Sequence, residues 1–315
     1  MSNLLDSRSR TRKPRSVPER MHEDEVPVDE ELVRRLLAAQ LPELADEPLT
    51  IVEPWGTDNA IWRVGHELVV RLPRIHWAVG QVAFEAEWLP RLAPYLPTPV
   101  PIPVAIGKPA EGYPYPWAVH RWIPGTSARI EDIEDPVAFA HELADVTRSL
   151  WTIPTRGAPP ARNRARPLQE YDAETRWFIE KCATLIDADP ALEAWETALG
   201  APPHQGPLVW VHGDLDGNYL LREGRLAGLV DWGSACVGDP AVDVQMVWSP
   251  LFDSTSREVF LRDLEVDDVT LARSKGAVVH QACGAVSYYS TTYPLIMERS
   301  WHKLEAVGVP RLPER

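Results

Sequence analysis

The stretch of sequence that decides the fold runs from His212 to Leu221 (HGDLDGNYLL) and resumes at Asp231-Trp232-Gly233. The apolar run 208–211 predicts a short strand that leads into this polar loop, and the two leucines at its end begin the strand that leaves it. A Glu-Gly turn then returns the chain as a third strand along 226–230. The stretch therefore predicts a strand, a polar loop and a hairpin.

A hairpin of this length brings Asp231 back to the level of the loop that holds Asp214, so the two carboxylates should converge from different strands. Convergent buried carboxylates repel each other and are costly to desolvate unless they share a cation or a proton. The pattern therefore predicts a chemical site at the mouth of the hairpin. The alternative is structural, with Asp214, Asp216 and Asp231 acting only as turn and cap residues.

Composition sets limits on the partners of the chain. It has 315 residues, 44% hydrophobic and 25% charged, and a formal net charge of −14, which argues against nucleic acid and would suit a cationic small molecule. No apolar run is long enough for a membrane span, and the first 20 residues contain no apolar signal segment. The three cysteines form no CxxC pair, which argues against a disulfide framework or a zinc site and favours a cytoplasmic location. No feature indicates an obligate protein partner.

The chain divides into three parts. Residues 1–25 are rich in arginine and poor in apolar residues, which predicts a disordered basic tail. Residues 26–122 predict a helix capped by Asp29, a meander of short strands, a helix over 79–92 and two further strands. Residues 123–315 predict mostly helices, interrupted by an Arg/Pro/Ala-rich loop and by the hairpin described above. The expected helices cover 135–151, 168–187, 190–199, 240–249, 257–264 and 267–290. Strands first and helices second predict an α+β fold with a cleft between a small N-terminal and a larger C-terminal lobe.

These motifs resemble the aminoglycoside phosphotransferase family, the small-molecule branch of the protein-kinase-like fold. The resemblance rests on VHGDLDGNYLL and LVDWGSACVGDPAVDV, whose leading aspartates lie 17 residues apart (214 to 231), and it extends to WGTDNAIWRVGHELVVRLPR and HRWIPG. It implies a two-lobed protein-kinase-like fold. It also implies an enzyme that uses Mg²⁺ and transfers the γ-phosphate of ATP or GTP to a hydroxyl of a small molecule. An antibiotic, either an aminoglycoside or a macrolide, is the first expectation for the acceptor.

The resemblance implies roles for single residues of the C-terminal half. Asp214 matches the catalytic aspartate, which orients the acceptor hydroxyl or takes its proton. Asp231 matches the metal-binding aspartate of the kinase Asp-Phe-Gly motif and should bind magnesium. His212 should pack beneath the loop, and Asp239 and Asp243 should brace it through hydrogen bonds.

One position departs from the family pattern in the metal site. The second metal-binding residue of the family is an asparagine, and its place here is taken by Tyr219, with Asn218 one residue earlier. A neutral phenol is a poor ligand for magnesium, which prefers hard oxygen ligands. Either Asn218 shifts into place, or Asp216 substitutes for it, or one of the two ions binds weakly. We favour Asn218 as the ligand.

The N-terminal half would hold the nucleotide. The turn that ends in Asn59 occupies the place of the phosphate-covering loop, although an ordinary hairpin turn explains it as well. Arg71 stands where kinases carry the lysine that grips the α- and β-phosphates. Glu85 on the following helix is its expected ion-pair partner, with Glu87 as the reserve.

The end of the last N-terminal strand would form the hinge between the lobes. His120 and Trp122 lie there and are candidate contacts of the nucleotide. Backbone groups of the hinge usually contact the purine edge, so the side chains here do not distinguish ATP from GTP.

Two alternative functions remain open. The acceptor could be a small metabolite related to choline, a sugar or an amino acid. A kinase-like protein that binds its ligands without transferring phosphate is the second alternative, and the residues at 71 and 219 favour it. The retention of Asp214 and Asp231 argues against that second alternative.

Overall fold

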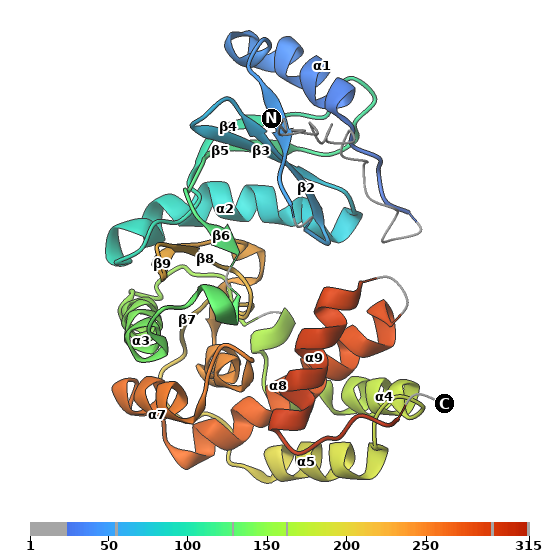
Figure 1. Ribbon diagram of the computed structural model, residues 1–315, viewed down its shortest axis with the longest axis vertical. Helices are drawn as coiled ribbons and strands as arrows, with labels where there is room; N and C mark the ends of the chain where they lie inside the picture. The colour runs from blue at the N-terminus through green and yellow to red at the C-terminus, as the bar shows by residue number, and fades with distance from the viewer. Residues whose placement is uncertain (1–23, 54–55, 128, 162, 291–292, 314–315) are drawn as a thin grey trace, which may run out of the picture.

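The computed structural model describes residues 24–53, 56–127, 129–161, 163–290 and 293–313. Its helices are α1 (Glu30–Gln40), α2 (Val79–Leu92), α3 (Pro136–Thr152), α4 (Asp172–Cys182), α5 (Ala188–Gly200), α6 (Ala241–Val244), α7 (Ser254–Asp263), α8 (Asp268–Tyr289) and α9 (Pro294–Ala306). Its strands are β1 (Leu49–Ile51), β2 (Asn59–Val64), β3 (Leu68–Pro73), β4 (Pro103–Gly107), β5 (Trp117–Arg121), β6 (Thr126–Ser127), β7 (Val209–Val211), β8 (Tyr219–Arg222), β9 (Arg225–Leu229) and β10 (Cys236–Gly238). The predicted α+β fold is confirmed, with a strand-rich lobe above a mostly helical one (Figure 1).

The N-terminal lobe is built on an antiparallel five-stranded sheet in the order β1-β2-β3-β5-β4. Helix α1 covers one face, where Leu36 and Leu37 share a buried apolar cluster with Trp62 and Val70. As predicted, the Asp29 side chain caps α1 by accepting from a backbone amide three residues later at 2.8 Å. Such a cap stabilises a helix by about 1 kcal/mol.

The opposite face of the sheet looks toward the rest of the molecule. Strand pairing aligns Arg71 with Ile61 and with Ala118, and directly paired residues share a face. Asn59 and His120 lie two residues from these partners along their own strands, so they share the face of Arg71. The sheet thus gathers three of the predicted nucleotide-binding residues on the side that faces α2 (Figure 1).

Helix α2 packs with both lobes. It lies between β3 and β4 in the chain, and its Glu85 side chain turns back to Arg71 on β3. Its apolar side chains Phe84, Leu89 and Leu92 instead belong to the large apolar cluster of the C-terminal lobe. Helix α2 lies before the predicted boundary at residue 122, and its apolar side chains connect it to the core of the C-terminal lobe.

The C-terminal lobe carries two small antiparallel sheets among its helices, β7 with β10 and β6 with β8 and β9. The predicted hairpin is β8–β9, in which Tyr219 is paired with Leu229. Trp195, Trp210 and Trp232 are fully buried in the core of this lobe. The two sheets place the loop after β7 next to the loop after β9, because both loops leave the same end of the lobe.

The structure corrects two of the helices that the sequence predicts in residues 123–315 and adds a third helix that was not predicted. The helix expected over 168–187 is a 3-10 turn, Leu168–Tyr171, followed by α4. The helix expected over 240–249 is α6 followed by the 3-10 turn Gln245–Trp248. Helix α9 was not predicted, since Lys303 is buried against the rest of the lobe and an inward-facing charge disrupts the apolar periodicity of a helix.

The N-terminal boundary also differs from the prediction. Residues 1–23 of the expected tail lie outside the described residues, but Glu25 is buried and forms an ion pair with the buried Arg74. The folded part therefore begins before residue 26. All three cysteines are free and buried.

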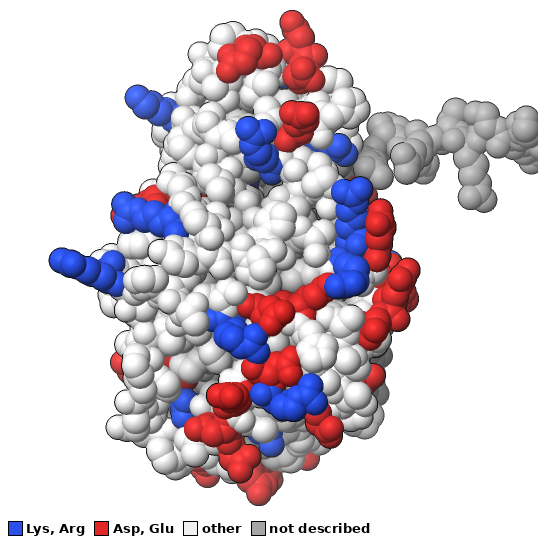
Figure 2. Space-filling view, turned by 90° about the vertical axis from the view of Figure 1, so that its left-hand side faces the viewer, with Lys and Arg blue, Asp and Glu red and all other residues white. Residues whose placement is uncertain are grey.

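The surface carries charges of both signs. Acidic and basic side chains are interspersed on the face shown in Figure 2, so the negative net charge is not gathered there into one acidic patch. None of the helices in the described part of the chain is long and apolar enough to span a membrane.

Candidate active site

The loop after β7 holds Asp214 in a fixed backbone frame. The carboxylate of Asp243 accepts hydrogen bonds from the amides of His212 (2.8 Å) and Gly213 (2.9 Å), which is the predicted bracing role. Gly213 has a φ of +77°, and a Cβ there would lie 2.8 Å from the carbonyl oxygen of Ser234. Glycine is therefore required at this position, because any side chain would meet backbone in an already strained conformation.

The two predicted bracing residues, Asp243 and Asp239, differ in their charge environment. Burial raises the pKa of Asp243 to about 7, although the two amide donors oppose the rise. Asp239, the other predicted brace, forms an ion pair with the buried Arg273 at 2.6 Å. Asp243 therefore holds the loop of Asp214, whereas Asp239 connects the segment before α6 to α8 through Arg273.

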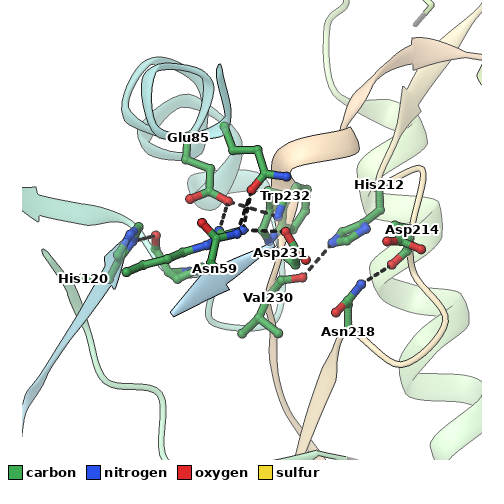
Figure 3. A network of polar contacts seen from close by, with 12 residues as sticks. Asn59, Glu85, His120, His212, Asp214, Asn218, Val230, Asp231 and Trp232 are labelled. Atoms are coloured by element: carbon green, nitrogen blue, oxygen red, sulfur yellow. Dashed lines mark hydrogen bonds and ion pairs between the residues drawn. The ribbon is translucent and has the colours of Figure 1, made fainter. Parts of the chain in front are cut away.

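His212 joins the loop of Asp214 to the hairpin that carries Asp231. Its Nε2 donates to the carbonyl of Val230 at 3.1 Å, and its ring packs on Trp232 with the centroids 4.7 Å apart. Burial lowers the pKa of His212 below its ordinary value despite the neighbouring carboxylates, so the ring is neutral at pH 7. Figure 3 shows the ring between the two aspartates. The predicted role beneath the loop is confirmed.

Asp231 turns its carboxylate into the cleft through an unusual backbone conformation. Its φ and ψ are 61° and 65°, in the left-handed region, which costs a non-glycine residue about 1–2 kcal/mol. Strained residues of this kind cluster at functional sites. Burial raises the pKa of Asp231, but Arg71, and then His212 and Arg164, lower it below the ordinary value. The side chain is therefore an anion, and it remains 40% exposed.

Arg71 faces Asp231 from the N-terminal lobe. Its Nη1 donates to Glu85 Oε1 at 2.5 Å, and its Nη2 donates to Asp231 Oδ1 at 2.7 Å. Burial lowers the pKa of Arg71, but Glu85 and then Asp231 raise it above its ordinary value, so the guanidinium stays charged. The predicted ion pair with Glu85 is present, and the same side chain reaches across to the second lobe (Figure 3).

Other neighbours complete this network. Gln81 Oε1 accepts from Arg71 Nη2 at 2.8 Å and from Asn59 Nδ2 at 3.0 Å. With its amide turned, the Asn59 oxygen lies 2.9 Å from Arg71 Nη2 instead. Glu87, the reserve partner, lies 3.6 Å from Arg91 on its own helix. Asn59 therefore lies beside the predicted phosphate grip as part of its hydrogen-bond network.

The hinge residues occupy the same face of the sheet. His120 is buried, and its Nδ1 donates to the carbonyl of Pro101 at 2.7 Å. Burial lowers the pKa of His120 to about 4, so its ring is neutral, and within the described structure its Nε2 has no hydrogen-bond partner. The Trp122 ring receives the guanidinium of Arg63 at 4.8 Å from its centroid. Both side chains lie at the end of β5, the last strand of the five-stranded sheet in chain order.

Tyr219 does not face the metal site. The ring is fully buried and packs edge-on against Phe139 with the centroids 5.6 Å apart. Adjacent residues on a strand point to opposite faces, so Asn218 is directed away from this core. The Asn218 amide donates to the backbone carbonyl of Asp214 at 2.8 Å, which leaves its side-chain oxygen for another partner.

The donor set fits magnesium. Asp231 and Asn218 offer a carboxylate and an amide oxygen on the two loops that converge here. Within the described residues no cluster of three or more His, Cys, Asp or Glu side chains forms a preset metal site. Mg²⁺ is commonly held by one or two protein oxygens together with the phosphates of a substrate, so two protein ligands suffice.

Asp216, the alternative metal ligand, is engaged elsewhere. Its Oδ2 lies 3.2 Å from Nζ of Lys303 on α9, and the two side chains are 10% and 9% exposed. Burial raises the pKa of Asp216, but Lys303 and Arg299 outweigh it and hold the pKa below its ordinary value. The charge of Asp216 is thus neutralised by α9, and its role is to fasten the loop to that helix.

Arg164 is a residue of the site that sequence reasoning missed. It lies in the 3-10 turn Asn163–Ala165 and forms an ion pair with Asp214. No motif marks it, and the only signal is the density of arginines in the loop over 154–167. The catalytic candidate therefore has a cation beside it.

The outer side of α9 borders a groove of about 630 Å³. Its lining includes Tyr293, Met297, Glu298, Trp301 and Glu305, and it does not include Asp214 or Asp231. The groove is therefore separate from the carboxylates of the cleft.

A cation that is paired with a buried glutamate and contacts Asp231 of the other lobe, with Asp214 on the neighbouring loop, can hold phosphates on one side and a metal ion and hydroxyl on the other. This arrangement on this fold defines a kinase-like phosphotransferase. Residues 50–275 match the model of the phosphotransferase enzyme family (APH), and the chain belongs to that family of small-molecule phosphotransferases. The resemblance seen in the motifs is thereby confirmed.

Solved structures agree with this fold. A GDP complex of aminoglycoside 2'-phosphotransferase-IIIa matches with a TM-score of 0.67 at 17% identity, over 89% of this chain and 99% of the other. Macrolide 2'-phosphotransferase type I matches with a TM-score of 0.63 at 19% identity, over 88% and 97%. Macrolide 2'-phosphotransferase MphH from Brachybacterium faecium matches with a TM-score of 0.58 at 23% identity, over 91% and 100%. No curated protein matches the chain in sequence to a significant degree. At such identities the likeness establishes the fold alone.

Proposed function

We propose that this protein transfers the γ-phosphate of ATP or GTP, with Mg²⁺, to a hydroxyl of an antibiotic of the aminoglycoside or macrolide class. The observation that carries the proposal is the fork of Arg71, which contacts Glu85 and Asp231 at once. It puts a fixed cation beside the metal-binding candidate. Structural neighbours described as aminoglycoside and macrolide phosphotransferases support the acceptor class.

The donor half of the site would work through Arg71. Its guanidinium can bind two phosphate oxygens of the nucleotide, and Glu85 holds it in place. Asp231 and Asn218 would hold the magnesium ion, which supplies charge to the phosphate oxygens during transfer. Because Arg71 contacts Asp231 in this structure, that carboxylate would have to give up its arginine partner in order to hold the ion.

The acceptor half would work through Asp214. Its carboxylate is 31% exposed, and the Asp243 brace fixes the loop that carries it. A carboxylate within hydrogen-bond reach of the acceptor hydroxyl orients it for in-line attack and takes its proton. Neighbours have been solved with GDP and with ADP, so both purines remain candidates for the donor.

The alternative without phosphoryl transfer loses its main support. The substitution at Tyr219 looked damaging because a phenol would replace a metal ligand, but the ring is buried in the core against Phe139. Arg71 keeps the glutamate partner that a phosphate grip needs. A small-metabolite acceptor remains the second candidate within the same reaction class.

Phosphoryl transfer across a panel of aminoglycosides, macrolides, choline, sugars and amino acids, with Mg²⁺ and ATP or GTP, tests the proposal. Asp214→Asn should lower kcat roughly 10²–10⁴-fold with little change in nucleotide affinity. The matched control is Asp145→Asn on an exposed turn of α3, which should change neither quantity. Transfer only to a metabolite would replace the antibiotic, and tight nucleotide binding without transfer to any acceptor would favour the binding protein.

A further inference from the structure

Arg164 comes from a segment remote from the catalytic loop in sequence. The turn that carries it lies between α3 and α4, and its Nη1 contacts Asp214 Oδ1. The two side chains are 38% and 31% exposed, so the pair is partly open to solvent. Exposed pairs of this kind contribute about 0–1 kcal/mol to folding stability, so stability alone does not explain this arginine.

The backbone that follows Arg164 is anchored to the lobe. Ala165 is buried in a small apolar cluster with Val211, directly before the catalytic loop. The amide of Arg166 donates to the Tyr171 hydroxyl at 3.1 Å, and its guanidinium lies over the Tyr171 ring. These neighbours fix the turn to the lobe, so the side chain of Arg164 is presented to the cleft from a fixed base.

The charges around Arg164 come from three different parts of the site. Burial lowers the pKa of Arg164, but Asp214, then Asp231 and then Asp58 raise it above its ordinary value. Asp58 belongs to the turn that covers the phosphates in the proposed function, Asp231 to the metal site and Asp214 to the acceptor side. The guanidinium therefore lies among the groups that would surround a phosphoryl group in transit.

We propose that Arg164 binds the transferred γ-phosphoryl group. This inference rests on the proposed function. Without substrates the guanidinium neutralises Asp214, and with nucleotide and acceptor in the cleft it donates hydrogen bonds to the equatorial oxygens of the γ-phosphate. In the transfer the acceptor oxygen bonds to phosphorus and the bond to the leaving diphosphate breaks. Asp214 receives the hydroxyl proton, and Arg164 keeps all of its own.

The competing view is a blocking contact, in which Arg164 merely occupies Asp214 until the acceptor displaces it. The two views predict opposite effects of removing the side chain. A phosphate ligand is needed for the reaction, and arginines that act on the transferred phosphoryl group are worth about 10³–10⁵ in kcat. A blocking arginine, once removed, would leave the rate equal or higher.

The first test is the affinity for nucleotides in the Arg164→Ala variant. Affinity for a non-hydrolysable nucleoside triphosphate with Mg²⁺ should fall roughly tenfold or more, since one charge-assisted contact is lost. Affinity for the diphosphate should stay near that of the wild type, because the diphosphate lacks the γ-phosphate. Arg156→Ala, on an exposed position of the same loop, is the matched control and should change neither affinity.

The second test is kinetic. The kcat of Arg164→Ala should fall at least 10²-fold with little change in the acceptor KM, Arg164→Lys should retain part of the rate, and added guanidinium ion should restore part of the rate of the alanine variant alone. An unchanged or raised kcat, or an equal loss of di- and triphosphate affinity, would overturn the proposal. The affinity comparison needs no acceptor, so it decides the role of Arg164 even if wild-type transfer, and with it the proposed function, fails.

Discussion

Replacing Arg71 with methionine should lower the stability of the protein, because it leaves the buried carboxylate of Glu85 without a counter-ion. Methionine keeps much of the volume and the apolar stem of arginine but removes the cation. Glu85, which is 1% exposed, then keeps the Trp232 amide at 3.2 Å as a donor but loses its counter-ion. Removing one partner of a buried ion pair costs about 3–5 kcal/mol. With roughly 2–4 °C per kcal/mol for a protein of this size class, Tm should fall by roughly 10 °C.

The stability that Arg71→Met loses should increase as the pH rises. Burial raises the pKa of Glu85 above its ordinary value of 4.5, and the Arg71 guanidinium opposes that rise. Without Arg71 the folded-state pKa climbs further. A carboxyl whose folded pKa lies above its unfolded pKa contributes stability at low pH and loses it as the pH rises through the folded pKa. The deficit of Arg71→Met should therefore be smallest near pH 4.5 and grow toward neutral and alkaline pH.

Urea denaturation at several pH values, with wild type, Arg71→Met, Glu85→Gln and the double variant, measures this coupling. The double variant should be more stable than Arg71→Met, because it no longer buries an unpaired carboxylate. The nucleotide KM should rise roughly tenfold or more in Arg71→Met and in the double variant, since both lack the proposed phosphate contact of Arg71. A deficit below 1 kcal/mol that is flat with pH would refute the buried ion pair, and an unchanged nucleotide KM would refute the phosphate grip.

Three further predictions concern the metal site, α9 and the hinge. Asn218→Ala should raise the Mg²⁺ concentration needed for half-maximal rate while Tyr219→Phe stays close to silent; the reverse in a magnesium titration would place the phenol at the metal. Lys303→Met should cost up to about 3–5 kcal/mol in urea denaturation, because it removes the ion-pair partner of the buried Asp216 and leaves only the weaker influence of Arg299, and an equally stable variant would show the pair to be solvated. His120, with a pKa of about 4 against an ordinary 6.5, should make the protein lose up to about 3 kcal/mol as pH falls from 6.5 to 4, and His120→Gln should flatten that loss in acid denaturation.

Local patterns in the sequence predicted the frame of the site correctly. The hairpin from Tyr219 to Leu229 follows from short apolar runs around a turn, and these runs need no distant partner to be recognised. The ion pair between Arg71 and Glu85 was likewise expected, since a strand and the next helix along the chain carry them. Contacts between elements that are adjacent in the chain could therefore be predicted from the sequence.

Contacts between segments that are distant in the sequence could not be predicted from the sequence. Arg164 lies in an irregular loop, and its approach to Asp214 depends on how Ala165 packs beneath that loop. Lys303 meets Asp216 from the last helix, where an inward-facing charge breaks the apolar periodicity that marks helices in a sequence. In both cases the functional signal is a charged side chain, and its partner is set only by tertiary packing.

The ion pairs Arg71–Asp231 and Arg164–Asp214 have the same consequence for the proposed site. Asp231 pairs with Arg71 and Asp214 pairs with Arg164, so each carboxylate of the proposed site has a cation before any substrate arrives. A site with only the carboxylates would repel a polyanionic nucleotide, and the protein as a whole carries a net charge of −14. Under the proposals made above, the phosphates take over both arginines as the nucleotide binds, which frees one carboxylate for magnesium and the other for the acceptor hydroxyl. Arginine at position 71 suits this exchange, because its fork keeps Nη1 on Glu85 while Nη2 moves from Asp231 to phosphate, whereas a lysine offers a single charged centre.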